Sequence, residues 1–169
     1  MENSRNNQAV WMAKWITDKT YKFANRTSPV PFTFRKRFVV DKPIKNAFIR
    51  ATALGIYELS INDKKVGNEY FAPGFTSYKH ILQFNEYDVT ELLQKDNEIL
   101  VVVGGGWAVG RFSYSSKSKI TCDRQAFLAE LFIDYADGTS EKITTDNSWR
   151  VTLEGNYRFG DFYDGETYD

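Results

Sequence analysis

The sequence predicts an all-β protein, built as an antiparallel β-sandwich or jelly roll with one or two short helical turns. Three observations support this class. Short stretches of alternating apolar and polar residues recur along the chain, turn-forming residues separate them, and no helical periodicity is sustained over three turns. Short strands joined by local turns are typical of antiparallel sandwiches and barrels.

The chain is expected to begin with a polar leader, residues 1–10, followed by a single domain over residues 11–169. Trp11, Trp15 and Ile16 follow the leader and are expected to anchor the N-terminal segment on the sandwich. A length of 169 residues suits one domain with a substantial core.

The next three alternating segments are residues 32–40, 47–53 and 57–67. In the last of them, Tyr57, Leu59 and Ile61 share one face, as period-two alternation requires. Asn62-Asp63 supplies a hairpin turn, because Asn and Asp tolerate left-handed backbone angles. Residues 68–80 are too long and irregular for a tight connection. Ordered loops of this kind on a rigid scaffold often carry binding residues.

The remaining strands are expected at residues 98–103, 127–135, 139–145 and 149–153. The first of these is apolar on both faces and should therefore be central in a sheet. Before it, Thr90 is expected to cap a short helical turn, with Glu91 in the first turn. Asp137-Gly138 lies in the turn of a second hairpin.

Charge and cysteine content exclude several classes of function. The 22 basic and 22 acidic side chains interleave, so neither nucleic acid nor an anionic membrane is an expected partner. The longest apolar run, residues 99–103, is too short to span a bilayer. Cys122 is the only cysteine, so no intramolecular disulfide can form. The polar start does not read as a secretory signal, and a cytoplasmic location is expected.

The glycine-rich corner Gly104-Gly105-Gly106-Trp107 is the first candidate site. Consecutive glycines let the backbone turn sharply and let a ligand approach closely. The corner is either a tight sandwich turn packed by Trp107 or a surface that faces a sugar. It is not a phosphate loop, since no Lys-Ser/Thr pair and no helix are expected after it. Arg111 follows four residues later, and its planar guanidinium suits vicinal hydroxyls or a carboxylate.

The acidic C-terminus is the second candidate, with Asp161, Asp164, Glu166 and Asp169 interleaved with aromatic residues. Such carboxylates could serve glycoside hydrolysis or bind Ca²⁺, but a solvated edge leading into another domain is the favoured interpretation. His80 lacks a partner for metal binding or for activating a nucleophile and is interpreted as structural. Cys122 is interpreted as a small buried side chain.

Seven segments, in order, resemble the N-terminal β-sandwich domain of bacterial α-L-rhamnosidases, a galactose-binding-like fold: residues 13–16, 34–40, 52–67, 72–78, 87–93, 104–107 and 163–169. Three positions depart from the family pattern. Asp63 stands where the hairpin usually has Gly, Gly105 where it has Asp, and Phe75 where it has Trp.

The resemblance implies a non-catalytic module of a glycoside hydrolase, because the family's catalytic carboxylates lie in a downstream helical barrel. Its expected partners are a rhamnose-containing glycan and that catalytic domain. The expected sugar contacts are Tyr78, Trp107, Arg111 and Asp123, through aromatic stacking and hydrogen bonds to hydroxyls. No cofactor is expected, although some relatives bind rhamnose with Ca²⁺. The alternatives are a purely structural domain that supports the catalytic barrel and, in third place, a free-standing hydrolase.

Overall fold

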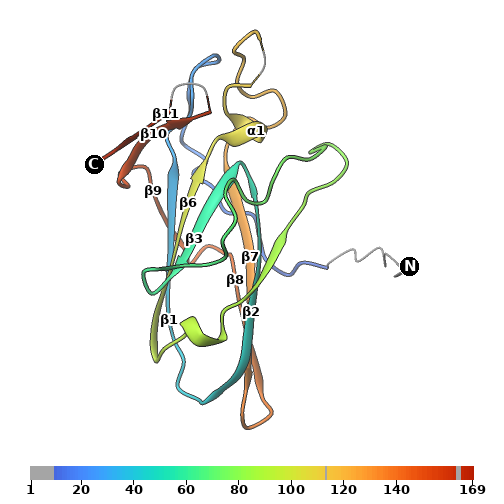
Figure 1. Ribbon diagram of the computed structural model, residues 1–169, viewed down its shortest axis with the longest axis vertical. Coiled ribbons are helices and arrows are strands. Elements are labelled where there is room, and N and C mark those ends of the chain that lie inside the picture. The colour runs from blue at the N-terminus through green and yellow to red at the C-terminus, as the bar shows by residue number, and fades with distance from the viewer. Residues whose placement is uncertain (1–9, 113, 163–164) are drawn as a thin grey trace.

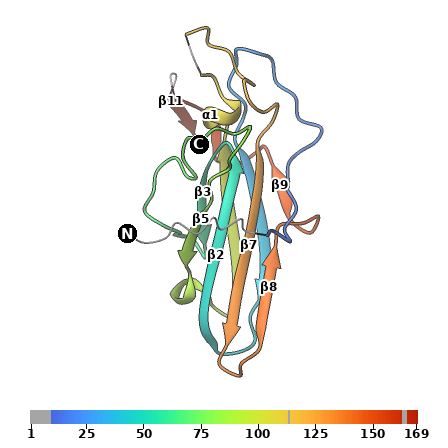
Figure 2. The same cartoon turned by 90° about the vertical axis from the view of Figure 1, so that its right-hand side faces the viewer.

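The computed structural model describes residues 10–112, 114–162 and 165–169, and it forms a β-sandwich (Figures 1 and 2). The elements in chain order are β1 (Phe32–Val39), β2 (Ile44–Leu54), β3 (Ile56–Ile61), β4 (Lys64–Lys65), β5 (Asn85–Asp88), the 3₁₀ turn η1 (Thr90–Leu92), β6 (Asp96–Gly104), α1 (Gly106–Val109), β7 (Ala126–Tyr135), β8 (Ser140–Thr144), β9 (Arg150–Thr152), β10 (Tyr157–Asp161) and β11 (Gly165–Tyr168). The predicted fold class is confirmed. The polar leader lies almost entirely outside the described residues.

The first sheet has five strands in the order β4-β3-β6-β1-β9, and all its pairs are antiparallel. The strand predicted to be central, β6, lies between β3 and β1. Its residues Ile99, Val101 and Val103 face the core and are at most 1% exposed. The prediction from two-sided apolar character is therefore confirmed.

The second sheet has the order β5-β2-β7-β8, and its long central pair is β2 with β7. Small side chains of β2, such as Ala51 and Ala53, are fully buried and face the first sheet. They leave room for Phe127, whose ring stacks with that of Phe34 at 6.2 Å and meets that of Tyr57 edge-on at 5.7 Å. These aromatic contacts join the two sheets across the core.

The hairpin between β3 and β4 turns at Asn62 and Asp63, which have φ angles of 52° and 62°. The Asn62 amide also donates to Leu92 O and to Asn97 Oδ1, each at 2.9 Å, and its Oδ1 accepts from Glu98 N at 2.9 Å. The asparagine thus ties the turn to η1 and to the start of β6, beyond supplying a permissive backbone.

The predicted cap at Thr90 is wrong. The residue before η1 is Val89, and no side chain caps the turn. Thr90 lies inside the turn instead, where its hydroxyl accepts from Ala47 N at 2.8 Å, while Asp88 Oδ1 accepts from Thr90 N. The hydroxyl is used to hold η1 against β2, so it is not available to the helix end.

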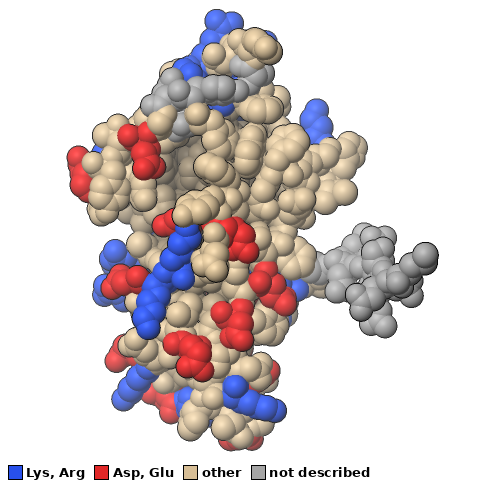
Figure 3. Space-filling view, in the orientation of Figure 1, with Lys and Arg blue, Asp and Glu red and all other residues tan. Residues whose placement is uncertain are grey.

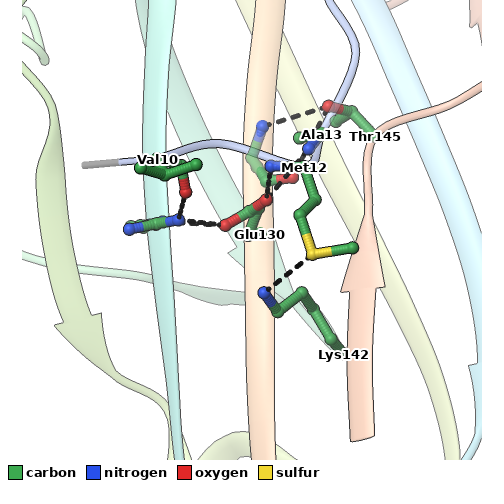
Figure 4. A network of polar contacts seen from close by, with 8 residues as sticks. Val10, Met12, Ala13, Glu130, Lys142 and Thr145 are labelled. Atoms are coloured by element: carbon green, nitrogen blue, oxygen red, sulfur yellow. Dashed lines mark hydrogen bonds and ion pairs between the residues drawn. The ribbon is translucent and has the colours of Figure 1, made fainter.

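An N-terminal strap, residues 10–17, lies against the second sheet (Figure 4). Ile16 and Phe127 exchange backbone hydrogen bonds of 3.0 Å, and Lys14 N donates to Thr145 O at 2.8 Å. Trp11 covers the guanidinium of Arg50, with 4.5 Å from Cζ to the ring centroid. The predicted anchoring by Trp11 and Ile16 is confirmed, whereas Trp15 is 40% exposed.

The C-terminal segment forms a separate hairpin of β10 and β11, in the region that the sequence suggested was a solvated edge. Figure 1 shows it beside α1 at one end of the sandwich. Within the described residues, no helix has the length and apolar character needed to cross a membrane.

Candidate functional site

The glycine corner at the end of β6 positions Trp107. Gly106 has a φ of +50°, and a Cβ there would lie 2.6 Å from Ile56 Cγ2, so both its backbone angle and its surroundings require glycine. The expectation that no helix follows is wrong: one turn, α1, begins at Gly106, and Val109 N donates to Gly105 O at 3.0 Å. This turn carries Trp107, whose side chain is partly buried.

Trp107 is the centre of an aromatic cluster, which comprises Phe71, Phe75, Tyr78, Trp107, Phe112 and Phe162. The Trp107 ring lies 4.7 Å from that of Phe162, 6.0 Å from that of Phe75 and 6.1 Å from that of Phe71. Phe71 and Phe75 come from the loop between β4 and β5 and are 52% and 60% exposed. Large aromatic side chains this exposed at one end of a fold mark an interaction surface.

A pocket of about 550 Å³ opens beside the cluster and shares Phe71 and Phe162 with it. This volume lies within the range of about 300–1,000 Å³ that is typical of small-molecule sites. The pocket wall combines aromatic rings with the carboxylates of Glu58, Glu69 and Glu166. Figure 3 shows that the upper part of this face carries few charged side chains, whereas the lower part carries many.

The loop that carries Phe71 is fixed to β3, because Tyr57 N donates to Ala72 O at 2.7 Å. Close by, Lys65 Nζ lies 3.0 Å from Glu58 Oε2 and 4.5 Å from the centroid of the Tyr70 ring. The hydrogen bond to Glu58 raises the pKa of Lys65. Among the described residues, the other two pocket carboxylates, Glu69 and Glu166, form no ion pair.

Two of the predicted sugar contacts meet in the cluster. Tyr78 reaches Trp107 through Phe75, whose ring centroid is 6.3 Å from that of Tyr78. Burial raises the pKa of Tyr78 to about 12, and the neighbouring Cys122 adds to the shift. Its hydroxyl is therefore protonated at neutral pH and can donate a hydrogen bond.

The other two predicted contacts lie on the segment after α1. Arg111 is partly buried in the first residues of that segment. Asp123 is exposed, and both of its oxygens accept from Arg124, at 3.0 Å and 2.8 Å. That ion pair lowers the pKa of Asp123. The described contacts do not connect Asp123 to the aromatic cluster.

The remaining candidates have different surroundings. Asp169 pairs with Arg158 at 2.7 Å, Glu166 lines the pocket, and Asp164 lies outside the described residues. His80 is exposed. Cys122 is only partly buried, which corrects its interpretation as a small buried side chain, and this partial burial raises the pKa of its thiol.

Sequence reasoning missed Phe71 and Phe162, which complete the cluster, and the pocket glutamates Glu58 and Glu69, whereas Glu166 was among the acidic C-terminal candidates. The available signal was the density of aromatic residues in segments 70–78 and 157–163, at two places far apart in the chain. No local pattern shows that these two segments meet at Trp107.

Within the described ranges, no group of three or more His, Cys, Asp or Glu side chains could hold a metal ion.

The fold and the site together define an accessory β-sandwich module that presents aromatic loops at one end. Residues 42–169 match the α-L-rhamnosidase N-terminal domain family, and the chain belongs to that family. It is 35% identical over 165 residues to an α-L-rhamnosidase of Alteromonas sp. (strain LOR), an alignment that covers 94% of this chain and 18% of the relative.

Solved structures agree with this assignment. An α-L-rhamnosidase from Aspergillus terreus superposes with a TM-score of 0.86 and 38% identity, over 92% of this chain and 18% of the other. An α-L-rhamnosidase of Streptomyces avermitilis, solved in complex with L-rhamnose, gives a TM-score of 0.78 and 36% identity, over 85% and 14% of the two chains. The present chain thus spans between 14% and 18% of the length of these relatives.

Proposed function

We propose that this domain recognises carbohydrate within a larger α-L-rhamnosidase, a glycoside hydrolase that removes terminal α-L-rhamnose from glycosides. The domain itself carries no catalytic residues in this proposal. The observation that carries it is the aromatic cluster of Trp107, Phe71 and Phe162, in which Phe71 is 52% exposed, beside a pocket that Phe71, Phe162 and the carboxylates of Glu69 and Glu166 line. The relative from Streptomyces avermitilis, solved with L-rhamnose, supports the choice of sugar.

The chemistry of the pocket suits a saccharide. A sugar ring has an apolar C–H face and a rim of hydroxyls, so it needs both an aromatic surface and hydrogen-bonding groups. In the proposal, Trp107 and Phe162 contact the C–H face, and Glu69 and Glu166 accept hydrogen bonds from hydroxyls. Hydrogen bonds to charged acceptors are about twice as strong as neutral ones.

The contacts expected from the sequence keep defined roles in this proposal. Tyr78 packs against Phe75 and holds the platform in place, with its protonated hydroxyl as a donor. Arg111 and Asp123 hydrogen-bond to sugar hydroxyls from the segment after α1. For Asp123 this requires the carboxylate to exchange part of its contact with Arg124 for the ligand.

Calorimetric titration with L-rhamnose and methyl α-L-rhamnoside, with and without Ca²⁺, tests the proposal. The Trp107→Ala variant is expected to bind roughly tenfold more weakly, as is usual when an aromatic anchor is truncated. Trp15→Ala is the matched control, because Trp15 is a half-exposed tryptophan on the N-terminal strap. Absence of binding by the wild-type domain at millimolar sugar rejects the proposal.

A purely structural role is the second candidate, and the exposure of Phe71 and Phe75 supports it. In that case the aromatic cluster is an interface with the catalytic domain of the longer protein. The discriminating measurement is the thermal stability of the full-length protein with Trp107→Ala. Loss of stability in the full-length protein alone, without any sugar binding, favours the structural role.

A further inference from the structure

A second cleft, of about 490 Å³, lies on the outer face of the five-stranded sheet. It is formed by β1, by β9 and by the turn before β9. Alternation along β1 places Thr33, Arg35 and Arg37 on this face. The register of the β1–β9 pair sets Arg150 directly opposite Arg35 and Thr152 opposite Thr33.

The charges in this cleft are not balanced. Glu98 Oε1 is shared by Arg37 Nε at 2.6 Å and Arg35 Nε at 3.6 Å. Arg150 forms no ion pair with any carboxylate in the described ranges. At the edge of the cleft, Lys36 donates to Ser148, and Asp146 accepts from Ser148 N at 2.8 Å. Three arginines thus line the cleft, and Glu98 is the one carboxylate paired with any of them among the described residues, in a chain whose total charge is zero.

The pairing of Arg35 with Arg150 is unfavourable by itself, because like charges directly opposite each other destabilise an antiparallel pair. An anion bound between the two guanidinium groups would attract both of them and so turn this local repulsion into a net attraction. Guanidinium groups form paired hydrogen bonds with the oxygens of a carboxylate or a sulfate. The hydroxyls of Thr33, Ser148 and Thr152 line the same cleft and can donate to further oxygens.

We propose that Arg35, Arg37 and Arg150 form a binding site for an oxyanion of the carboxylate or sulfate type, either free or carried on an acidic saccharide. The cleft ends at Thr33, whose register partner Val102 lines the aromatic pocket. An acidic saccharide could therefore reach both sites along one face of the sheet. The saccharide form rests on the proposed function, whereas binding of a free oxyanion does not.

The arginine side-chain N–H resonances report on this site directly. Spectra of the domain are recorded during titration with sulfate, D-galacturonate and its neutral counterpart D-galactose, at constant ionic strength set with chloride. The Nε–H signals of Arg35, Arg37 and Arg150 are expected to shift with the two anions and not with galactose. The same shifts with galactose or with chloride alone overturn the proposal.

Two variants with the same charge change separate the site from general electrostatics. Arg150→Gln is expected to weaken anion binding at least about fivefold, because it removes one charged donor. Arg26→Gln is the control, since the Arg26 side chain forms no hydrogen bond or ion pair with a described residue and lies outside the cleft. An equal loss of anion affinity in the two variants contradicts the proposal. Without anion, Arg150→Gln is expected to raise the melting temperature, which also shows that it folds.

A third titration distinguishes the source of the anion. Oligogalacturonate that binds more tightly than galacturonate and sulfate supports a saccharide-borne anion. Equal binding of all three supports a free-anion site, and the proposed oxyanion chemistry stands in both cases. If the wild-type domain binds sulfate but not rhamnose, the proposed function alone is refuted. If it binds rhamnose but not sulfate, this inference alone is refuted.

Discussion

Replacement of Glu130 by alanine should strongly destabilise the domain, although this side chain is on the outer side of β7. Glu130 is 0% exposed because the N-terminal strap covers it (Figure 4). Its carboxylate accepts from Met12 N at 2.5 Å and from Ala13 N at 2.9 Å. It also pairs with Arg50, whose side chain is 15% exposed and whose Nε lies 2.9 Å from Glu130 Oε2.

The magnitude follows from what the substitution leaves behind. Removal of one partner from a buried ion pair costs about 3–5 kcal/mol. Arg50 keeps a hydrogen bond to Val10 O at 2.7 Å and some contact with water. The expected loss is therefore about 3 kcal/mol, at the lower end. For a domain of this size that corresponds to a fall in melting temperature of about 6–12 °C. Glu130→Gln retains an acceptor oxygen and should cost about 1–2 kcal/mol.

The pH dependence gives an independent check. Burial raises the pKa of Glu130, but the hydrogen bonds from Arg50, Ala13 and Met12 outweigh it and lower the pKa below its usual value. A carboxylate whose pKa is lower in the folded state stabilises the fold at pH values above its unfolded-state pKa of about 4.3. This stabilisation is lost as the pH falls through the folded-state pKa. Wild type should therefore lose more stability in acid than Glu130→Gln.

Thermal unfolding followed by circular dichroism, at neutral and acidic pH, measures both effects. Glu154→Ala, an exposed glutamate on the other sheet's edge, is the control and should change little. A melting temperature for Glu130→Ala equal to that of the control would refute the structural role of the strap.

Four further substitutions test other parts of the structure. Asn62→Ala should lower the free energy of unfolding in urea by about 2–4 kcal/mol, because it removes three hydrogen bonds. Asp63→Gly should be neutral or stabilising, because residue 63 has a φ of 62°. Equal effects of the two substitutions would contradict this account of the turn. Gly105→Asp should destabilise the domain by about 1–3 kcal/mol and so lower its melting temperature. The reason is that a Cβ at this position would lie 2.8 Å from Gly110 Cα and from Pro29 Cγ. An unchanged melting temperature would argue against tight packing at this corner. Phe75→Trp enlarges the exposed platform and should tighten rhamnose binding a few-fold in calorimetry, and unchanged binding would place Phe75 outside the contact surface.

The elements with clear periodicity were predictable from sequence, and the contacts between distant segments were not. The alternation of residues 57–61 and the two-sided apolar character of 98–103 depend only on local pattern, so β3 and the central position of β6 were predicted correctly. The burial of Glu130 depends on a strap more than 110 residues away, as shown by the separation of Met12 and Glu130. No window of sequence contains that information.

The same limit applies to the candidate site. The glycine corner and Trp107 were recognised because consecutive glycines beside tryptophan are a local signal. Phe162 was not, because it reaches Trp107 only through the hairpin of β10 and β11. The pair Asp164-Gly165 in that segment is a turn signal, but the density of acidic residues favoured a solvated edge.

The central claim is that a saccharide binds at the end of the sandwich around Trp107. It is tested most directly by two-dimensional NMR of the isolated domain during titration with L-rhamnose. The account predicts saturable shifts of the Trp107 indole N–H and of the Gly104–Gly106 amides, with the Trp15 indole unchanged. Shifts confined to another face, or none at millimolar rhamnose, would contradict it.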